Sequence, residues 1–171
     1  IQLDGKPVST KSPKDAIRQG ICLLTEDRKT EGLILGQTVR ENFGLPNLSH
    51  FTSLGFIRQR EESREFLSYV DQIQIKITDP EQITGNLSGG NQQKVALGKW
   101  LSISPKVILV NEPTRGVDVG ARAEIYQKLR DLASQGSAIV IASTDIQEIT
   151  NLPDRVISFY RGEMIRELKL E

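Results

Sequence analysis

The sequence of 171 residues is poor in reactive and aromatic side chains, with one cysteine, one histidine and one tryptophan. A single cysteine, Cys22, excludes a disulfide framework and fits a reducing compartment such as the cytoplasm. It lies in the apolar run 21–24, so we expect a buried, inert thiol. Aromatic residues make up only 5% of the chain, which argues against a base-stacking platform for nucleic acid. The only histidine, His50, stands far from every motif and is expected at the surface.

Charge and hydropathy exclude two further classes of protein. Lys and Arg number 22, Asp and Glu also number 22, and the formal net charge is therefore zero. Without a basic excess we expect no nucleic-acid partner. No apolar stretch approaches the ~20 residues that span a bilayer. A chain of this length buries a sizeable core and normally forms one domain.

Hydrophobic periodicity predicts alternating strands and helices. A hairpin is expected around Asp4-Gly5, followed by a helix that Ser12 caps. Further strands are expected at 21–24, 107–110 and 138–142. Further helices are expected at 58–71, from Ser88 onward and at 121–135. A terminal hairpin is expected to join 156–160 to 163–168. This order is typical of an α/β fold with a mostly parallel sheet, and the polar, helical pattern of 38–85 indicates an α-helical insertion. In the helix 58–71, Phe66, Leu67 and Val70 are expected to face the core, whereas Glu61, Glu62, Arg64 and Glu65 are expected in solvent.

The stretch 87–94, Leu-Ser-Gly-Gly-Asn-Gln-Gln-Lys, carries the strongest chemical signal. Ser88 can cap a helix with its hydroxyl, and Gly89 and Gly90 have no side chains to keep a ligand away from the backbone. A helix that begins this way presents free N–H groups and the positive end of its dipole, which is an anion site and most often a phosphate site. An ordinary capped helix start is the alternative.

About twenty residues later, the apolar strand 107–110 runs into Asn111 and Glu112. A carboxylate at the carboxyl end of a buried strand is where nucleotide enzymes keep a base. LSGG followed by NQQK, and then a strand entering NEPTRGVDVGA, resembles the ABC-type ATPases. More narrowly, the sequence is similar to the second ATPase half of the tandem ATP-binding subunits of bacterial sugar importers.

The resemblance runs from Ile1 to about Leu170. It implies a P-loop NTPase-like fold in which 1–37 and 86–171 form the α/β core and 38–85 form the helical subdomain. The family's first strands and its phosphate-binding P-loop should lie upstream of Ile1, and the sequence contains neither. The resemblance therefore implies a partial ABC ATPase domain that is inactive on its own.

The family also assigns roles to the signature and to the loop that follows the strand 107–110. Ser88, Gly89, Gly90 and Gln92 match the signature that closes, in trans, over ATP held by the P-loop of the opposite half. Asp118 matches the acidic residue of the loop that crosses the dimer axis. ATP and Mg²⁺ are the implied cofactors of the complete protein.

Four other positions match the half's own nucleotide site. Glu112 stands at the position of the general base that orients the attacking water. Asn111 replaces the usual aspartate of the Mg²⁺ shell, and an amide lacks the charge that favours a hard cation. Thr144 replaces a histidine that contacts the γ-phosphate, and Glu26 replaces the glutamine that senses the metal. We therefore expect this site to be degenerate; for Glu26, a solvated charged turn is the alternative.

Together these residues imply an energy-coupling ATPase of a bacterial importer for a sugar or related solute. Its expected partners are the opposite ATPase half and membrane permease subunits, which would dock on the helical subdomain, at the cytoplasmic face of the inner membrane. The alternatives are a non-hydrolysing structural or regulatory half, an ABC protein of DNA repair or chromosome organisation, and a domain that binds another phosphate ligand. The short insertion and balanced charge argue against the second, and Glu112 against the third.

Overall fold

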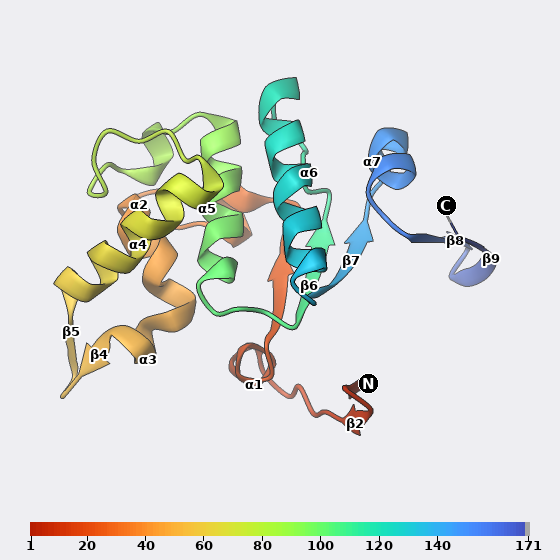
Figure 1. Cartoon of the computed structure of the whole chain (residues 1–171), viewed down its shortest axis with the longest axis horizontal. Helices are drawn as coiled ribbons and strands as arrows, with labels where there is room; N and C mark the ends of the chain where they lie inside the picture. The colour runs from red at the N-terminus through yellow and green to blue at the C-terminus, as the bar shows by residue number, and fades with distance from the viewer. Residues whose placement is uncertain (170–171) are drawn as a thin grey trace.

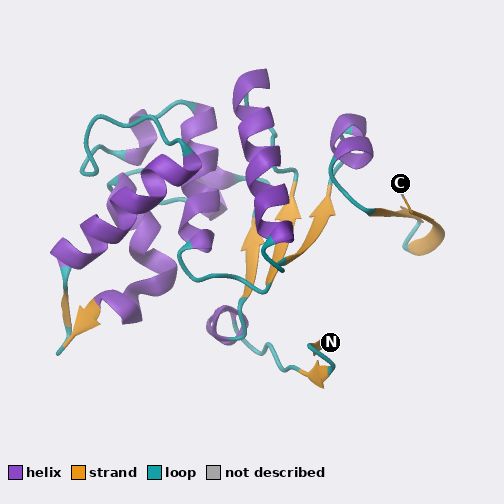
Figure 2. Cartoon of the chain, viewed as in Figure 1, coloured by secondary structure: helices purple, strands orange, loops and turns teal. Residues whose placement is uncertain are grey.

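A computed structural model describes residues 1–169, and its centre is a three-stranded parallel sheet in the order β3-β6-β7 (Figures 1 and 2). Apolar, largely β-branched residues build these strands, and Leu24, Val110 and Ile141 lie side by side across them. The expected α/β fold with a parallel sheet is confirmed. The strands are β3 (Ile21–Leu24), β6 (Val107–Asn111) and β7 (Ala138–Ala142).

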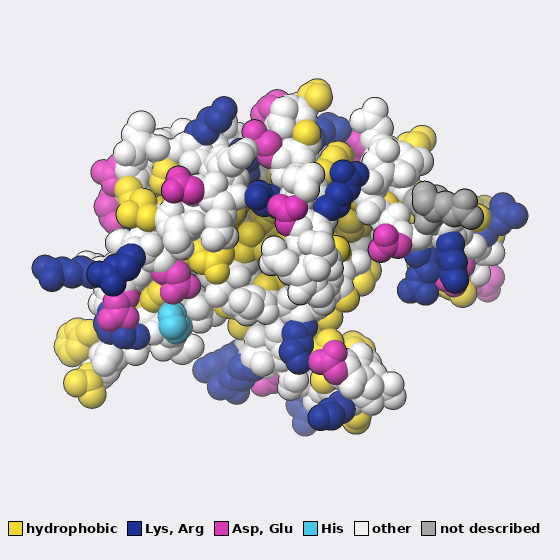
Figure 3. Space-filling model, in the orientation of Figure 1, with side chains coloured by type: hydrophobic (Ala, Val, Ile, Leu, Met, Phe, Trp, Pro, Cys, Tyr) yellow, Lys and Arg dark blue, Asp and Glu magenta, His cyan; other side chains and the backbone are white. Residues whose placement is uncertain are grey.

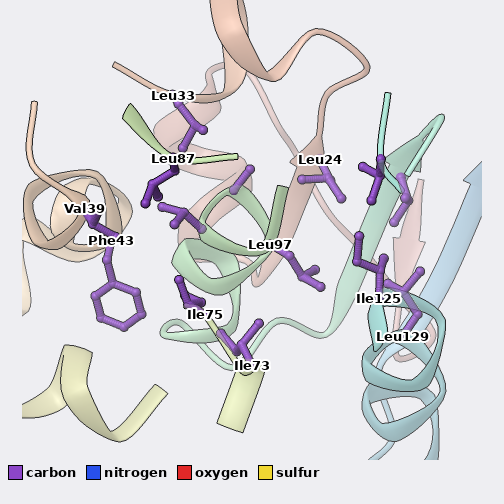
Figure 4. Close-up of a cluster of buried hydrophobic side chains, with 14 of the residues drawn as sticks. Leu24, Leu33, Val39, Phe43, Ile73, Ile75, Leu87, Leu97, Ile125 and Leu129 are labelled. Atoms are coloured by element: carbon purple, nitrogen blue, oxygen red, sulfur yellow. The ribbon is translucent and has the colours of Figure 1, made fainter. Parts of the chain in front are cut away.

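Helices α5 (Gly89–Leu101) and α6 (Val119–Ser134) pack beside the sheet. Successive strand residues alternate between two faces, so Cys22 and Ile108 are buried while Leu23 and Leu109 are partly exposed on the other face. Figure 4 shows the apolar core that joins β3 to α5 and α6. The core continues through α5 to the helical segment, so one cluster holds both parts together.

The remaining elements are short. α1 (Pro13–Arg18) begins at Ser12, whose hydroxyl accepts a hydrogen bond from the Asp15 amide, as the sequence predicted. Two antiparallel hairpins lie at the ends of the described chain, and both were predicted. The elements are β1 (Gln2–Leu3), β2 (Lys6–Pro7), α7 (Ile146–Asn151), β8 (Arg155–Tyr160) and β9 (Glu163–Lys169).

The segment between β3 and α5 is mainly helical, with one exception that the sequence did not predict. A small hairpin protrudes from it, and hydrophobic atoms are visible at its tip in Figure 3. His50 lies next to this hairpin with 58% of its side chain exposed, which confirms its surface position. The elements are a π-helical turn (Arg28–Gly32), α2 (Val39–Gly44), a 3-10 turn (Leu45–Asn47), α3 (Leu48–Phe51), β4 (Thr52–Ser53), β5 (Phe56–Ile57), α4 (Gln59–Ile73) and a 3-10 turn (Thr84–Asn86).

Helix α4 corrects two expectations about its faces. Phe66 is buried as predicted, but Leu67 is 49% exposed and Glu62, expected in solvent, is 2% exposed. Glu62 is buried because Arg40 of α2 donates a hydrogen bond to its carboxylate. A Cβ at Gly44 would overlap the same carboxylate, so a larger residue there would displace Glu62.

All three guanidinium nitrogens of Arg40 donate hydrogen bonds to carboxylates. Besides Glu62 it binds Glu81 through two hydrogen bonds, from Nε at 2.5 Å and from Nη2 at 3.0 Å. Burial raises the pKa of the Glu62 carboxyl, and Arg40 opposes that shift. This buried ion pair therefore fixes α2 against α4, because either partner alone would be a desolvated charge.

Breaking this pair should be costly. We expect Arg40→Met to lower the free energy of unfolding by ~3–5 kcal/mol, because Glu62 is left buried without its cation. Urea unfolding of the chain measures this. The matched control is Glu61→Gln, which removes the exposed Arg58–Glu61 pair of the same helix and should cost at most ~1 kcal/mol. Equal losses in the two variants would show that burial of the Arg40–Glu62 pair does not matter.

Candidate functional site

The carboxyl ends of β3, β6 and β7 meet at one edge of the sheet because the three strands are parallel. Asn111 is the last residue of β6, and Glu26, Glu112 and Thr144 follow the ends of β3, β6 and β7. The structure brings them together in two hydrogen-bonded pairs. Asn111 Nδ2 lies 3.5 Å from Glu26 Oε2, and the Thr144 amide and hydroxyl donate to Glu112 Oε1 at 2.8 and 3.0 Å.

Glu112 holds an unusual backbone conformation for an acidic residue, with φ of +48°. Its own amide continues the sheet by donating to the carbonyl of Ala142 at 2.9 Å. The left-handed conformation costs an L-residue roughly 1–2 kcal/mol. It follows directly after the end of β6 and orients the carboxylate toward Thr144. The sequence carried no signal for this conformation.

The Glu26 carboxylate forms an ion pair with Arg115, in the loop that follows β6. Its second oxygen faces the Asn111 amide. Glu26 is therefore no simple solvated turn residue; its charge is shared between two groups from the neighbouring strand end.

The fit of this edge to Mg²⁺ is poor. Within residues 1–169, no group of three His, Cys, Asp or Glu side chains is arranged to hold a metal ion. The Glu26 carboxylate is already bound to Arg115, and Asn111 contributes an uncharged amide. Mg²⁺ usually binds one or two carboxylates together with phosphate oxygens, so these residues do not form a cation site of their own.

The signature lies at the start of α5, where Ser88 is the N-cap. The Ser88 hydroxyl accepts from the Asn91 amide at 3.4 Å, and the Ser88 side chain is exposed. The α5 dipole and its first N–H groups give this helix start a partial positive charge.

Close packing also favours glycine at both glycine positions of the signature. A Cβ at Gly89 would lie 2.8 Å from Arg28 Nη2 and 3.0 Å from the Gly116 carbonyl oxygen. A Cβ at Gly90 would lie 2.9 Å from the Cβ of Ala121 in α6. The sequence explained these glycines by access for phosphate; the structure adds that any larger residue would collide with the neighbouring loop and helix.

Gln92 was predicted to contact nucleotide, and in this structure its side chain already has partners within the chain. Its side chain is 4% exposed, and its amide nitrogen donates to the carbonyls of Leu87 at 3.2 Å and Thr84 at 3.4 Å. Gln92 therefore supports the backbone ahead of α5. The next residue, Gln93, is also buried and donates to the Pro113 carbonyl at 2.8 Å, which ties α5 to the loop after β6.

Asp118 is the N-cap of α6, and its carboxylate accepts from the Ala121 amide at 3.0 Å. Backbone hydrogen bonds lower the pKa of Asp118, so this exposed carboxylate stays ionised under ordinary conditions. The sequence predicted its place in the loop but not its capping role.

Arg28 is a residue that the sequence gave no reason to select. It begins a π-helical turn, residues Arg28–Gly32, which Asp27 caps, and its side chain turns inward. Its exposed fraction is 9%, and it donates to the Arg115 carbonyl at 2.9 Å. Burial lowers the pKa of the Arg28 guanidinium. The only available signal was an arginine in the charged loop that follows the strand 21–24.

In the described part of the chain, residues 1–169, no helix is long and apolar enough to cross a membrane. Two surface hollows, of about 630 and 700 Å³, are lined mainly by α4 in one case and by α4, α6 and the segments that precede β6 and β7 in the other. Neither touches Glu26, Asn111, Glu112 or Thr144.

Comparison with known proteins gives consistent results. The model of the family described as ABC transporter matches residues 1–115. The ribose import ATP-binding protein RbsA of Oceanobacillus iheyensis is 45% identical over 171 residues, which are 100% of this chain and 34% of that protein. RbsA of Bacillus subtilis is 42% identical over 168 residues, 98% of this chain and 34% of its own length. The chain thus spans about one third of the length of the curated relatives it matches.

Solved structures agree on the fold. A dimeric bacterial ABC transporter cassette superposes with a TM-score of 0.71 at 27% identity, covering 87% of this chain and 62% of that one. A nucleotide-free cassette of an ABC transporter reaches a TM-score of 0.80 at 20% identity over 99% of this chain and 68% of that one, which supports the fold alone.

The strain at Glu112 can be measured. We expect Glu112→Gly to give a more stable chain than Glu112→Ala by about 1 kcal/mol, because both lose the bonds to Thr144 but only glycine accepts a positive φ freely. Urea unfolding of the two variants gives the difference. At Ala123, exposed within α6, Ala→Gly should instead cost about 0.5–1 kcal/mol. A preference for alanine at both positions would refute the strain.

Proposed function

Since this chain belongs to the ABC transporter family of ATP-binding domains, we propose that it is one half of the ATPase that energises a bacterial importer of ribose or a related sugar. The relatives named as ribose import proteins support the sugar class. The observation that carries the ATPase role is the meeting of Glu26, Asn111, Glu112 and Thr144 at one strand edge, beside a capped glycine helix start.

In this proposal the signature serves the opposite half. Ser88 is exposed, and the start of α5 offers backbone N–H groups and a positive dipole end to an anion. The γ-phosphate of ATP held by the opposite half is that anion. Ser88 contributes its hydroxyl, whereas Gly89 and Gly90 let the helix start lie close to the loop at 113–118. That loop, with Asp118 at its end, faces the partner half.

The chain's own site is degenerate in this proposal. Glu112 has the position of a general base, but Thr144 donates two hydrogen bonds to one of its oxygens. Glu26 is held by Arg115, and Asn111 brings no charge for a cation. Since these residues do not fit Mg²⁺, Asn111 has no part in holding a cation in this proposal. A half that never hydrolyses ATP is the second candidate, and the occupied carboxylates favour it.

The remaining assignments concern partners and domain division. We propose that 1–37 and 86–171 form the α/β core and that 38–85 form the helical subdomain on which membrane permease subunits dock. The loop at Glu26 would share that interface. The complete protein would then lie at the cytoplasmic face of the inner membrane, bound to the permease rather than spanning the membrane itself.

A pair of variants in the full-length tandem protein tests the division of labour. Ser88→Ala should lower ATP turnover on the order of 10²-fold, the usual effect of removing one donor to transition-state charge. Glu112→Gln should leave most of the turnover. Ser12→Ala, which removes a comparable helix cap far from both sites, is the control and should leave turnover unchanged. Loss of turnover in Glu112→Gln would show that the site is competent.

The chain alone should bind MgATP only weakly. Its sequence contains no glycine-rich loop ending in lysine, so the strongest phosphate contacts of the family are missing from it. Titration calorimetry of the 171-residue chain with MgATP should give no saturation at micromolar nucleotide, whereas the full-length protein should saturate. A micromolar dissociation constant for the chain alone would overturn this expectation.

A further inference from the structure

We propose that Arg28 is a positioning residue that couples the loop after β3 to the signature and to the loop after β6. The inference rests on the proposed function, in which the signature acts on ATP of the opposite half. Arg28 itself contacts no nucleotide in this scheme. It sets where the start of α5 lies relative to the loop at 113–118.

The Arg28 guanidinium makes two hydrogen bonds and closely approaches Gly89. Arg28 Nη1 donates to the Arg115 carbonyl at 2.9 Å, and Nη2 lies 3.5 Å from the Gly116 carbonyl oxygen. The same Nη2 would be 2.8 Å from a Cβ at Gly89. A planar guanidinium can bridge two successive carbonyls while lying flat against a glycine, and a lysine ammonium cannot.

A second contact holds the same two loops together. The Glu26 carboxylate, two residues before Arg28, pairs with the Arg115 side chain. The loop after β3 is therefore fixed to Arg115 twice, once through its side chain and once through its backbone. A displacement of this loop moves the backbone at 115–116 and the face of Gly89 together.

Stability alone is a poor explanation for Arg28. Its exposed fraction is 9%, its Nε has no hydrogen-bond partner, and its hydrogen bonds within residues 1–169 go to the carbonyls of Arg115 and Gly116. The nearby Asp27 carboxylate only opposes the lowering of the Arg28 pKa by burial, and burying a cation whose hydrogen bonds go to carbonyls is expensive. We therefore attribute the burial of Arg28 to its position between the loop after β3, the start of α5 and the loop after β6.

The loop after β3 is where the proposed permease contact meets the ATPase. Arg28 connects this loop to two segments that close over ATP, so it provides a direct physical path from the membrane partner to the signature. A misplacement of about 1 Å at a catalytic constellation can cost 10²-fold in rate, so small shifts of this link are sufficient to control turnover.

The test uses Arg28→Gln and Arg28→Lys in the full-length tandem protein. We expect Arg28→Gln to lower kcat between about 10- and 100-fold. Arg28→Lys should recover only a minor part, because charge without the planar fork cannot bridge Arg115 and Gly116. Lys11→Gln, which removes an exposed charge outside this loop, is the control and should leave kcat unchanged.

Binding measurements separate positioning from loss of structure. A positioning residue leaves the stoichiometry and dissociation constant for ATP, measured by calorimetry without Mg²⁺, as in the parent protein. Loss of kcat in proportion to a loss of ATP sites would overturn the inference. If Arg28→Gln does not fold, Arg28→Lys is judged by the same criteria.

Ser88→Ala distinguishes this inference from the proposed function. Normal turnover in Arg28→Gln together with loss of turnover in Ser88→Ala overturns the role of Arg28 and leaves the proposed function intact. Normal turnover in both variants overturns both. Loss of turnover in both, with ATP binding retained in Arg28→Gln, is the expected result.

Discussion

Parallel pairing of β6 with both β3 and β7 is the constraint on which the rest of the structure depends. The pairing places Leu24, Val110 and Ile141 in one row, so the chain leaves all three strands at the same edge. Residues that are 85 positions apart in sequence, Glu26 and Asn111, meet there without any local signal to bring them together. Burial of Cys22 and Ile108 against the helices fixes the register, because a slip by one residue would turn the apolar row to the other face.

Polar groups at this edge mainly satisfy one another. Glu112 accepts from Thr144, and Glu26 is shared between Arg115 and Asn111. A site that must bind and release a polyanion with a cation usually keeps its charged groups free for the ligand. Here the carboxylates already have partners from the protein, so a ligand must compete with internal hydrogen bonds. In the proposed function, these internal hydrogen bonds are the reason for assigning the chain a degenerate site of its own.

The sequence predicted the regular elements well because their signals are local. Ser12 and Ser88 identified helix starts, and the apolar runs identified the three parallel strands. It failed where burial depends on a distant partner. Glu62 looked solvated in the pattern of its own helix, but Arg40, 22 residues earlier, makes its burial possible. The burial of Gln92 and Arg28 was not foreseen for a related reason, since their partners are backbone carbonyls that no side-chain pattern reveals. The positive φ of Glu112 has no sequence signal because the sheet edge imposes it.

The signature glycines carry less functional information than the motif suggests. Gly90 cannot be larger because Ala121 and the Asp118 carboxylate lie 2.9 and 3.2 Å from the position of its Cβ. Gly89 is limited in the same way by Arg28 and Gly116. A half that never touched nucleotide would still favour glycine at both positions, because a Cβ there would force neighbouring atoms to shift. Ser88 is different, because it is exposed and its capping role can be filled by Asp, Asn or Thr with little loss. Of the capping residues, aspartate would repel a phosphate while preserving the helix, so a serine here, and not the glycine pair, is the residue whose identity argues for an anion.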